Sequence, residues 1–92
     1  MLIGYCKINI FLPQSLSLKR KRQIILGTKE RMRRKFNIAV AERPLDKWQI
    51  AELSFVCVNY TRRYVEEQLF KVEEYLRLQG EFHIIDCEKQ VF

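Results

Sequence analysis

The feature that most constrains the fold is the order in which two hydrophobic patterns follow one another along 92 residues. Four stretches alternate apolar and polar side chains, as half-buried strands do, and two longer stretches repeat apolar residues at helical spacing. The pattern predicts strands over Leu2–Leu12, Asn37–Arg43, Ile50–Tyr60 and Phe82–Phe92. It predicts one helix that starts at Leu18, and a second that starts at Asn59 or Thr61 and is stopped by Gly80.

This order, strand-helix-strand-strand-helix-strand, predicts the α+β class. With right-handed crossovers it gives the ferredoxin-like arrangement, a four-stranded antiparallel sheet with both helices on one face. A chain of this length leaves no room for a second fold, so residues 1–92 are expected to form a single domain. The apolar core fills most of such a small domain, which favours a binding module over an enzyme with a large cavity.

Positive charge is concentrated in the first predicted helix. Of 17 basic and 11 acidic residues in the chain, nine basic residues and one acid fall between Leu18 and Phe36, and the remainder is slightly acidic. A helix with cations along its length can follow a phosphate backbone without reading sequence. The candidate nucleic-acid-binding residues are Lys19, Arg20, Lys21, Arg22, Arg31, Arg33, Arg34 and Lys35.

Three other interpretations of the basic helix remain open. It can be a solvated face of a highly charged protein, or it can meet the acidic second helix of a neighbouring copy. Arg22 can also lie along the edge of the core, with its stem buried and its guanidinium in water.

The sheet face that the helices leave open is a second candidate surface. RNA-recognition domains of this topology stack bases on aromatic residues there, and Tyr5 and Phe11 project from the first strand. The third strand lacks the basic-glycine-aromatic octapeptide of such domains, and Glu52 would repel phosphate. A homodimer or partner interface is therefore favoured for this face, with Tyr5, Lys7, Asn9, Phe11, Trp48 and Glu52 as its candidate residues. Trp48 is interpreted as a packing cap over one sheet edge, with an exposed recognition role as the alternative.

No pattern in the chain predicts a catalytic, metal or cofactor site. Cys6, Cys57 and Cys87 are too far apart in sequence for a zinc site or a redox dithiol, so we expect buried thiols in a reducing, cytoplasmic compartment. No signal peptide, membrane-spanning segment or glycine-rich phosphate loop is visible, so neither a membrane nor a small-molecule substrate is expected. An enzyme would require a cleft that joins Glu42, Glu52 and the only histidine, His83.

The start of the first predicted helix carries a specific motif, Leu12-Pro13-x-Ser15-x-Ser17-Leu18-Lys19-x-Lys21-Arg22. It resembles the signature of the bacterial YlxP-like family, small proteins of undetermined function. Supporting matches cover Ile3-Gly4-x-Cys6, Arg33-x-x-Phe36-Asn37-Ile38-x-Val40-Ala41-Glu42 and Trp48-Gln49-x-Ala51-Glu52-Leu53. The chain departs from the family at Arg20, often acidic there, at Thr28, and at Asn59-Tyr60-Thr61-Arg62-Arg63.

The resemblance implies a ferredoxin-like fold. Family genes often lie beside genes for a translation initiation factor and a ribosome-binding factor, which implies work on the ribosome or its RNA. We therefore expect a non-enzymatic domain that binds ribosomal RNA or a ribosomal subunit through its basic first helix. The alternative is a homodimeric protein-interaction module that works through the open sheet face.

Overall fold

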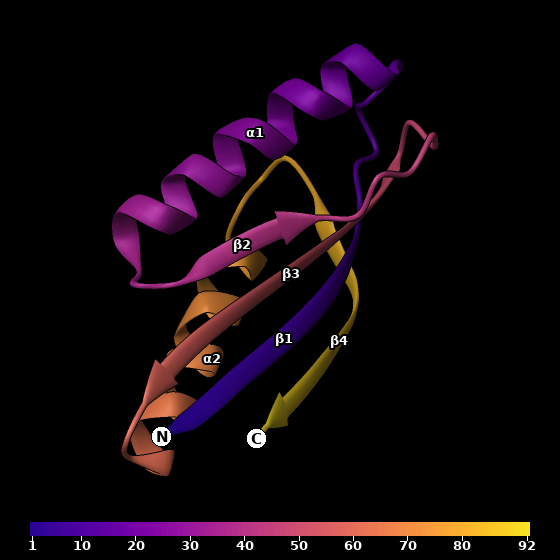
Figure 1. The fold of residues 1–92 in the computed structure, drawn as a ribbon. Coiled ribbons are helices and arrows are strands. Elements are labelled where there is room, and N and C mark those ends of the chain that lie inside the picture. The colour runs from indigo at the N-terminus through magenta and orange to yellow at the C-terminus, as the bar shows by residue number, and fades with distance from the viewer.

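The computed structural model describes residues 1–92 and has the predicted order of elements (Figure 1). The elements are β1 (Leu2–Phe11), α1 (Leu18–Lys35), β2 (Ala39–Glu42), β3 (Ile50–Asn59), α2 (Arg62–Arg77) and β4 (His83–Val91). The sheet order is β2-β3-β1-β4 and all neighbouring strands are antiparallel. Both helices pack on the same face of the sheet, so the predicted ferredoxin-like α+β fold is confirmed.

The central strand β1 shows the clearest link between pattern and packing. Its even-numbered residues from Cys6 to Ile10 are buried under the helices, whereas the odd-numbered ones face the open side. Gly4 lies where α2 approaches the strand most closely, because a Cβ there would be 2.5 Å from Cγ1 of Val65. The missing side chain of Gly4 therefore allows α2 to rest directly on β1.

The core lies between the sheet and the helices and contains 16 buried hydrophobic residues. In α2, the apolar residues at helical spacing, Val65, Leu69, Val72 and Leu76, are all buried. In α1, a stripe at helical spacing that includes Ile25, Thr28 and Met32 is buried, and the Thr28 hydroxyl donates a hydrogen bond to the Ile24 carbonyl at 2.8 Å. The threonine in this stripe therefore leaves no unsatisfied polar group.

The start of α1 agrees with the sequence pattern, whereas the end of α2 differs from the prediction. Of the two serines that precede α1, Ser15 and Ser17, it is Ser17 that caps the helix, because its Oγ accepts a hydrogen bond from the Arg20 amide at 3.0 Å. The prediction that Gly80 stops α2 is wrong, because the helix ends at Arg77 and no glycine has a positive φ. Leu78 closes α2 instead, with its amide bonded to the Glu74 carbonyl.

Two residues face a different side from the one that the pattern predicts. The register between β1 and β4 shifts near Asn9, so Cys87 points toward the helices rather than sharing a face with His83. Its Sγ lies 3.3 Å from Sγ of Cys6. The helical spacing of Glu73, next to the buried Val72, favours the outer face of α2, but Glu73 is only 8% exposed because it turns toward β4 and bonds Lys89.

The molecule is elongated, with principal extents of 42 × 20 × 18 Å. One narrow end is formed by the start of α1, the segment that follows β1, and the loop 43–49 between β2 and β3 (Figure 1). Neither helix is long and apolar enough to cross a membrane.

Candidate nucleic-acid interface

Helix α1 carries its cations along an outer edge of the molecule. The helix lies over β2 at the side of the sheet, whereas α2 lies across β1, β3 and β4 (Figure 1). Its 18 residues span about 27 Å at the usual rise of 1.5 Å per residue. Eight of its nine basic side chains reach the surface at least in part, and Lys21 is the exception.

Four of these cations form the outer cationic face, which we define as Lys19, Arg22, Arg33 and Arg34. All four are exposed and none forms an ion pair with a carboxylate. Arg33 donates a hydrogen bond to the Val40 carbonyl of β2 at 3.1 Å, which orients its guanidinium without neutralising it. Arg22 is exposed, and nothing in the structure shows its stem buried along the edge of the core.

The remaining cations of α1 have partners on other elements. Arg20 and Arg31 both approach Glu81, at 3.9 and 3.5 Å, in the segment that leads into β4. Lys29 pairs with Glu42 of β2 at 3.9 Å. These contacts are long and partly exposed, so they contribute little to stability. Each nearby carboxylate nevertheless offsets positive charge on the helix, which leaves the four unpaired cations as its main positive surface.

The Lys35 ammonium lies near two aromatic rings where α1 approaches α2. It is 5.9 Å from the Phe36 ring centroid and 5.6 Å from that of Tyr75. Both separations are within the range of a cation–π interaction. Lys35 remains exposed at the surface.

The prediction that Lys21 belongs to this surface is wrong. The residue is 2% exposed, and its ammonium donates hydrogen bonds to the carbonyls of Leu45, Lys47 and Ile50 at 2.9, 2.7 and 2.8 Å. Burial lowers the pKa of this ammonium, and the three carbonyls replace the water that it loses. The available signal was its spacing, since Lys21 lies four residues before Ile25 in the apolar stripe.

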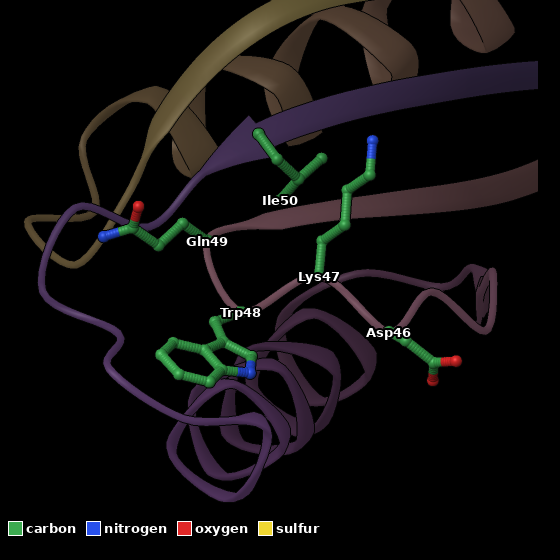
Figure 2. A pocket seen from close by; sticks show the side chains of 5 residues that line it. All are labelled: Asp46, Lys47, Trp48, Gln49 and Ile50. Carbon is green, nitrogen blue, oxygen red and sulfur yellow. The ribbon is translucent and has the colours of Figure 1, made fainter.

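The loop that Lys21 holds bears the exposed Trp48. A surface hollow of about 410 Å³ is lined by Asp46, Lys47, Trp48, Gln49 and Ile50 (Figure 2). The Trp48 side chain is 54% exposed, which favours the exposed role over the packing cap. Figure 2 shows the Trp48 and Lys47 side chains extending from opposite sides of the loop. Lys47 is a cation that the sequence analysis did not single out, although it directly precedes Trp48.

The other predicted interface residues share the open sheet face. Lys7 pairs with Glu88 at 3.2 Å, and Asn9 donates a hydrogen bond to Asp86 at 2.8 Å. Glu52 pairs with Arg43 at 3.7 Å, so a band of matched polar groups crosses the middle of the face. Tyr5 and Phe11 are half-buried on either side of this band. Trp48 lies on the loop 43–49 and not on a strand of this face, and its place in the interface stays a prediction.

The structure does not bring together the residues that an active-site cleft would require. Glu42 pairs with the inward-facing Leu53, and Glu52 belongs to the open face, so the two carboxylates lie on opposite sides of the sheet. His83 is exposed opposite Phe11. No group of three or more histidine, cysteine, aspartate or glutamate side chains is placed to hold a metal ion.

The three cysteines are free. Cys6 and Cys57 are buried and Cys87 is half-buried, as expected for thiols that pack as small apolar side chains. Burial raises the pKa of all three thiols, which makes them poor nucleophiles.

Comparison with known proteins gives a family but no relative of established activity. No curated protein matches the chain. The model of one protein family, described as a protein of unknown function (DUF503), matches residues 3–89. Since this match spans nearly the whole chain, with both helices and at least most of every strand, the chain belongs to the DUF503 family.

Proposed function

We propose that this protein is a non-enzymatic RNA-binding domain that docks on phosphates through the outer cationic face of α1. The single observation that carries the proposal is that Lys19, Arg22, Arg33 and Arg34 are exposed without a carboxylate partner. The resemblance to the YlxP-like family and its gene neighbourhood favour ribosomal RNA, in a ribosomal subunit, as the partner. The free, buried cysteines are compatible with a cytoplasmic site of action.

The shape of the interface suggests how such binding works. A protein helix does not fit the deep, narrow major groove of an A-form duplex, so α1 would lie along the phosphate backbone. Each phosphate neutralised by a lysine or arginine releases counterions, and affinity then falls as salt rises. For a single strand the log–log slope changes by about −0.7 for each contact.

The test compares two triple variants that remove the same charge from different helices. One variant is Lys19→Gln, Arg22→Gln and Arg34→Gln on α1. The matched control is Arg62→Gln, Arg63→Gln and Lys71→Gln, three exposed cations of α2. Binding to a labelled fragment of ribosomal RNA is measured by gel mobility shift at several salt concentrations.

We expect the α1 variant to lose at least about tenfold in affinity at low salt, and the salt slope to fall by about two. The α2 variant should stay close to wild type, because the same loss of net charge occurs outside the interface. An absence of wild-type binding at low salt, or equal losses in the two variants, would contradict the proposal.

Homodimerisation through the open sheet face is a second candidate function. Ile3, Val58 and Phe92 are exposed and lie side by side across β1, β3 and the end of β4. An apolar cluster of this kind is typical of contact surfaces. Sedimentation velocity of the wild type and of Val58→Glu tests it. A concentration-dependent dimer that the substitution abolishes supports the candidate, and a strict monomer at high concentration excludes it.

A further inference from the structure

Trp48 stands out because its loop is held rigidly while its indole is left in solvent. The Lys21 ammonium binds three carbonyls of residues 45–50. On the other side, Gln49 donates from its side chain to the Pro13 carbonyl at 3.1 Å, and its own carbonyl accepts from the Leu12 amide at 2.8 Å. The loop is therefore fixed to both α1 and the end of β1, and 54% of the Trp48 side chain remains exposed.

The position of Trp48 relates it to the outer cationic face. Lys21, which holds the loop, lies between Lys19 and Arg22 in the first turns of α1. Figure 2 draws the indole toward this end of α1, whereas the Asp46 carboxylate points away from it. Lys47 also lines the hollow, but its side chain extends from the opposite side of the loop to that of Trp48. The only tryptophan of the chain is thus tied to the helical turns that carry unpaired positive charge.

An exposed aromatic ring on a fixed loop beside cations has the chemistry of a base-stacking site. Every nucleobase has a π-face, so stacking is tolerant of sequence, and nearby lysines and arginines hold the backbone. A base inside a duplex cannot present this face, because its neighbours already cover it. Because the loop is already ordered, stacking would require little loss of conformational freedom.

The open sheet face is less suited to stacking. Tyr5 and Phe11 are half-buried, and three carboxylates, Glu52, Asp86 and Glu88, lie in the band between them. Phosphates would meet these acids on either side of a stacked base. Trp48 has one neighbouring acid, and that side chain is turned away.

We propose that Trp48 stacks on an unpaired base, so that the nucleic acid followed by α1 is single-stranded where it passes the loop 43–49. This inference rests on the proposed function, because the phosphates held by Lys19 and Arg22 bring the strand to the tryptophan. It narrows the substrate class from RNA in general to RNA with an unpaired segment at the narrow end of the molecule.

Intrinsic fluorescence tests the inference directly, because Trp48 is the only tryptophan. The wild type is titrated with oligouridine, which forms no duplex, and with a fully paired RNA duplex of equal length. Affinity is measured in parallel by anisotropy of a label on each RNA. The variants are Trp48→Ala and, as the conservative control, Trp48→Phe, which keeps an aromatic face.

We expect oligouridine to quench the fluorescence of Trp48 and the duplex to leave it almost unchanged. Trp48→Ala should weaken oligouridine binding by roughly tenfold, with little effect on the duplex, and Trp48→Phe should retain most of the affinity. Circular dichroism melting checks that both variants remain folded.

The outcomes separate the two proposals. If neither RNA binds, the proposed function fails. If RNA binds but the fluorescence and the Trp48→Ala affinity are unchanged, only the stacking role fails. Equal quenching by single-stranded and duplex RNA overturns the restriction to unpaired bases.

Discussion

The two helices use the same residue types in opposite ways. In α2, Arg62, Arg63 and Arg77 each form an ion pair with a glutamate four positions away on the same helix. In α1 the only acid is Glu30, so no such ladder forms and its cations either reach other elements or remain unpaired. Acids at helical spacing therefore pair the arginines of α2, whereas their scarcity in α1 leaves four of its cations without a carboxylate partner.

The helices also differ in how they rest on the sheet. Helix α2 approaches β1 so closely at Gly4 that no Cβ would fit. Helix α1 lies over the short edge strand β2 and exposes Leu26 in addition to its charges. We therefore expect α2 to contribute mainly to folding stability and α1 mainly to binding, and the following substitutions examine that division.

The largest loss of stability is expected from a substitution of Lys21. This residue is an exception to the proposed division, because it belongs to α1 but should contribute to folding stability. Lys21→Ala leaves three buried carbonyls without their donor and removes a packed side chain, so the free energy of unfolding should fall by about 3 kcal/mol. The exposed Lys19→Ala is the control and should change stability by less than about 0.5 kcal/mol. Urea unfolding measures both. Equal stability of the two variants would show that the loop does not depend on Lys21.

Gly4→Ala should show how closely α2 rests on the sheet. The new methyl group would overlap Val65, and we expect a loss of about 2 kcal/mol in the free energy of unfolding. A double-mutant cycle with Val65→Ala checks the cause, since Gly4→Ala should be less harmful once the valine methyl groups are gone. Additive effects of the two substitutions would place the strain elsewhere.

We expect the ion pairs of Glu73 to make the free energy of unfolding depend on pH in the acidic range. Burial disfavours its charged form, but hydrogen bonds from Lys89 and Arg77 outweigh that effect and hold the pKa of Glu73 below its usual 4.5. Its contribution is therefore complete above pH 4.5 and is lost as the pH falls through the lowered value.

Glu73→Gln should cost about 1–2 kcal/mol at pH 7, and the difference from wild type should shrink toward pH 2. Thermal unfolding across this range measures it. The exposed Glu30→Gln of α1 serves as the control and should change the free energy of unfolding at pH 7 by less than about 0.5 kcal/mol. Parallel curves for the wild type and Glu73→Gln would contradict the assigned role of this carboxylate.

The smallest effect is expected at Gly27 of α1, and it should have the opposite sign to that at Gly4. A Cβ at Gly27 would meet only the terminal nitrogen of the flexible Arg31 side chain, at 3.3 Å. Gly27→Ala should therefore stabilise the protein by roughly 0.5–1 kcal/mol through helix propensity. A loss of stability in urea unfolding would mean that the surroundings of Gly27 leave less room for a methyl group than the single contact with Arg31 indicates.

The sequence predicts the fold well because the hydrophobic period of β1, β3 and α2 indicates which of their apolar residues face inward. It does not predict the fate of Lys21, since its burial depends on carbonyls supplied by residues 45–50. Cys87 escapes prediction because the register shift that turns it inward has no glycine or proline to mark it. For Glu73, the partner Lys89 comes from a strand packed against α2 rather than from the helix itself.

The candidate site, like the fold, could be predicted only in part from the sequence. The concentration of cations in α1 is visible in the sequence, but which of them remain unpaired depends on Glu42 and Glu81, which come from other elements. The exposure of Trp48 depends on how its loop is held. Local pattern therefore locates the charged helix, and tertiary contacts select the residues available on its surface.

The central place of β1 in the sheet has a consequence for synthesis. β1 is made first, but it lies between β3 and β4, and Ile10 pairs with Ile84 near the start of the last strand. At roughly 5–20 residues per second, on the order of 4–15 s pass before that pairing can begin. During this interval one edge of an apolar strand has no neighbour, so we expect the nascent chain to need protection from aggregation until β4 emerges.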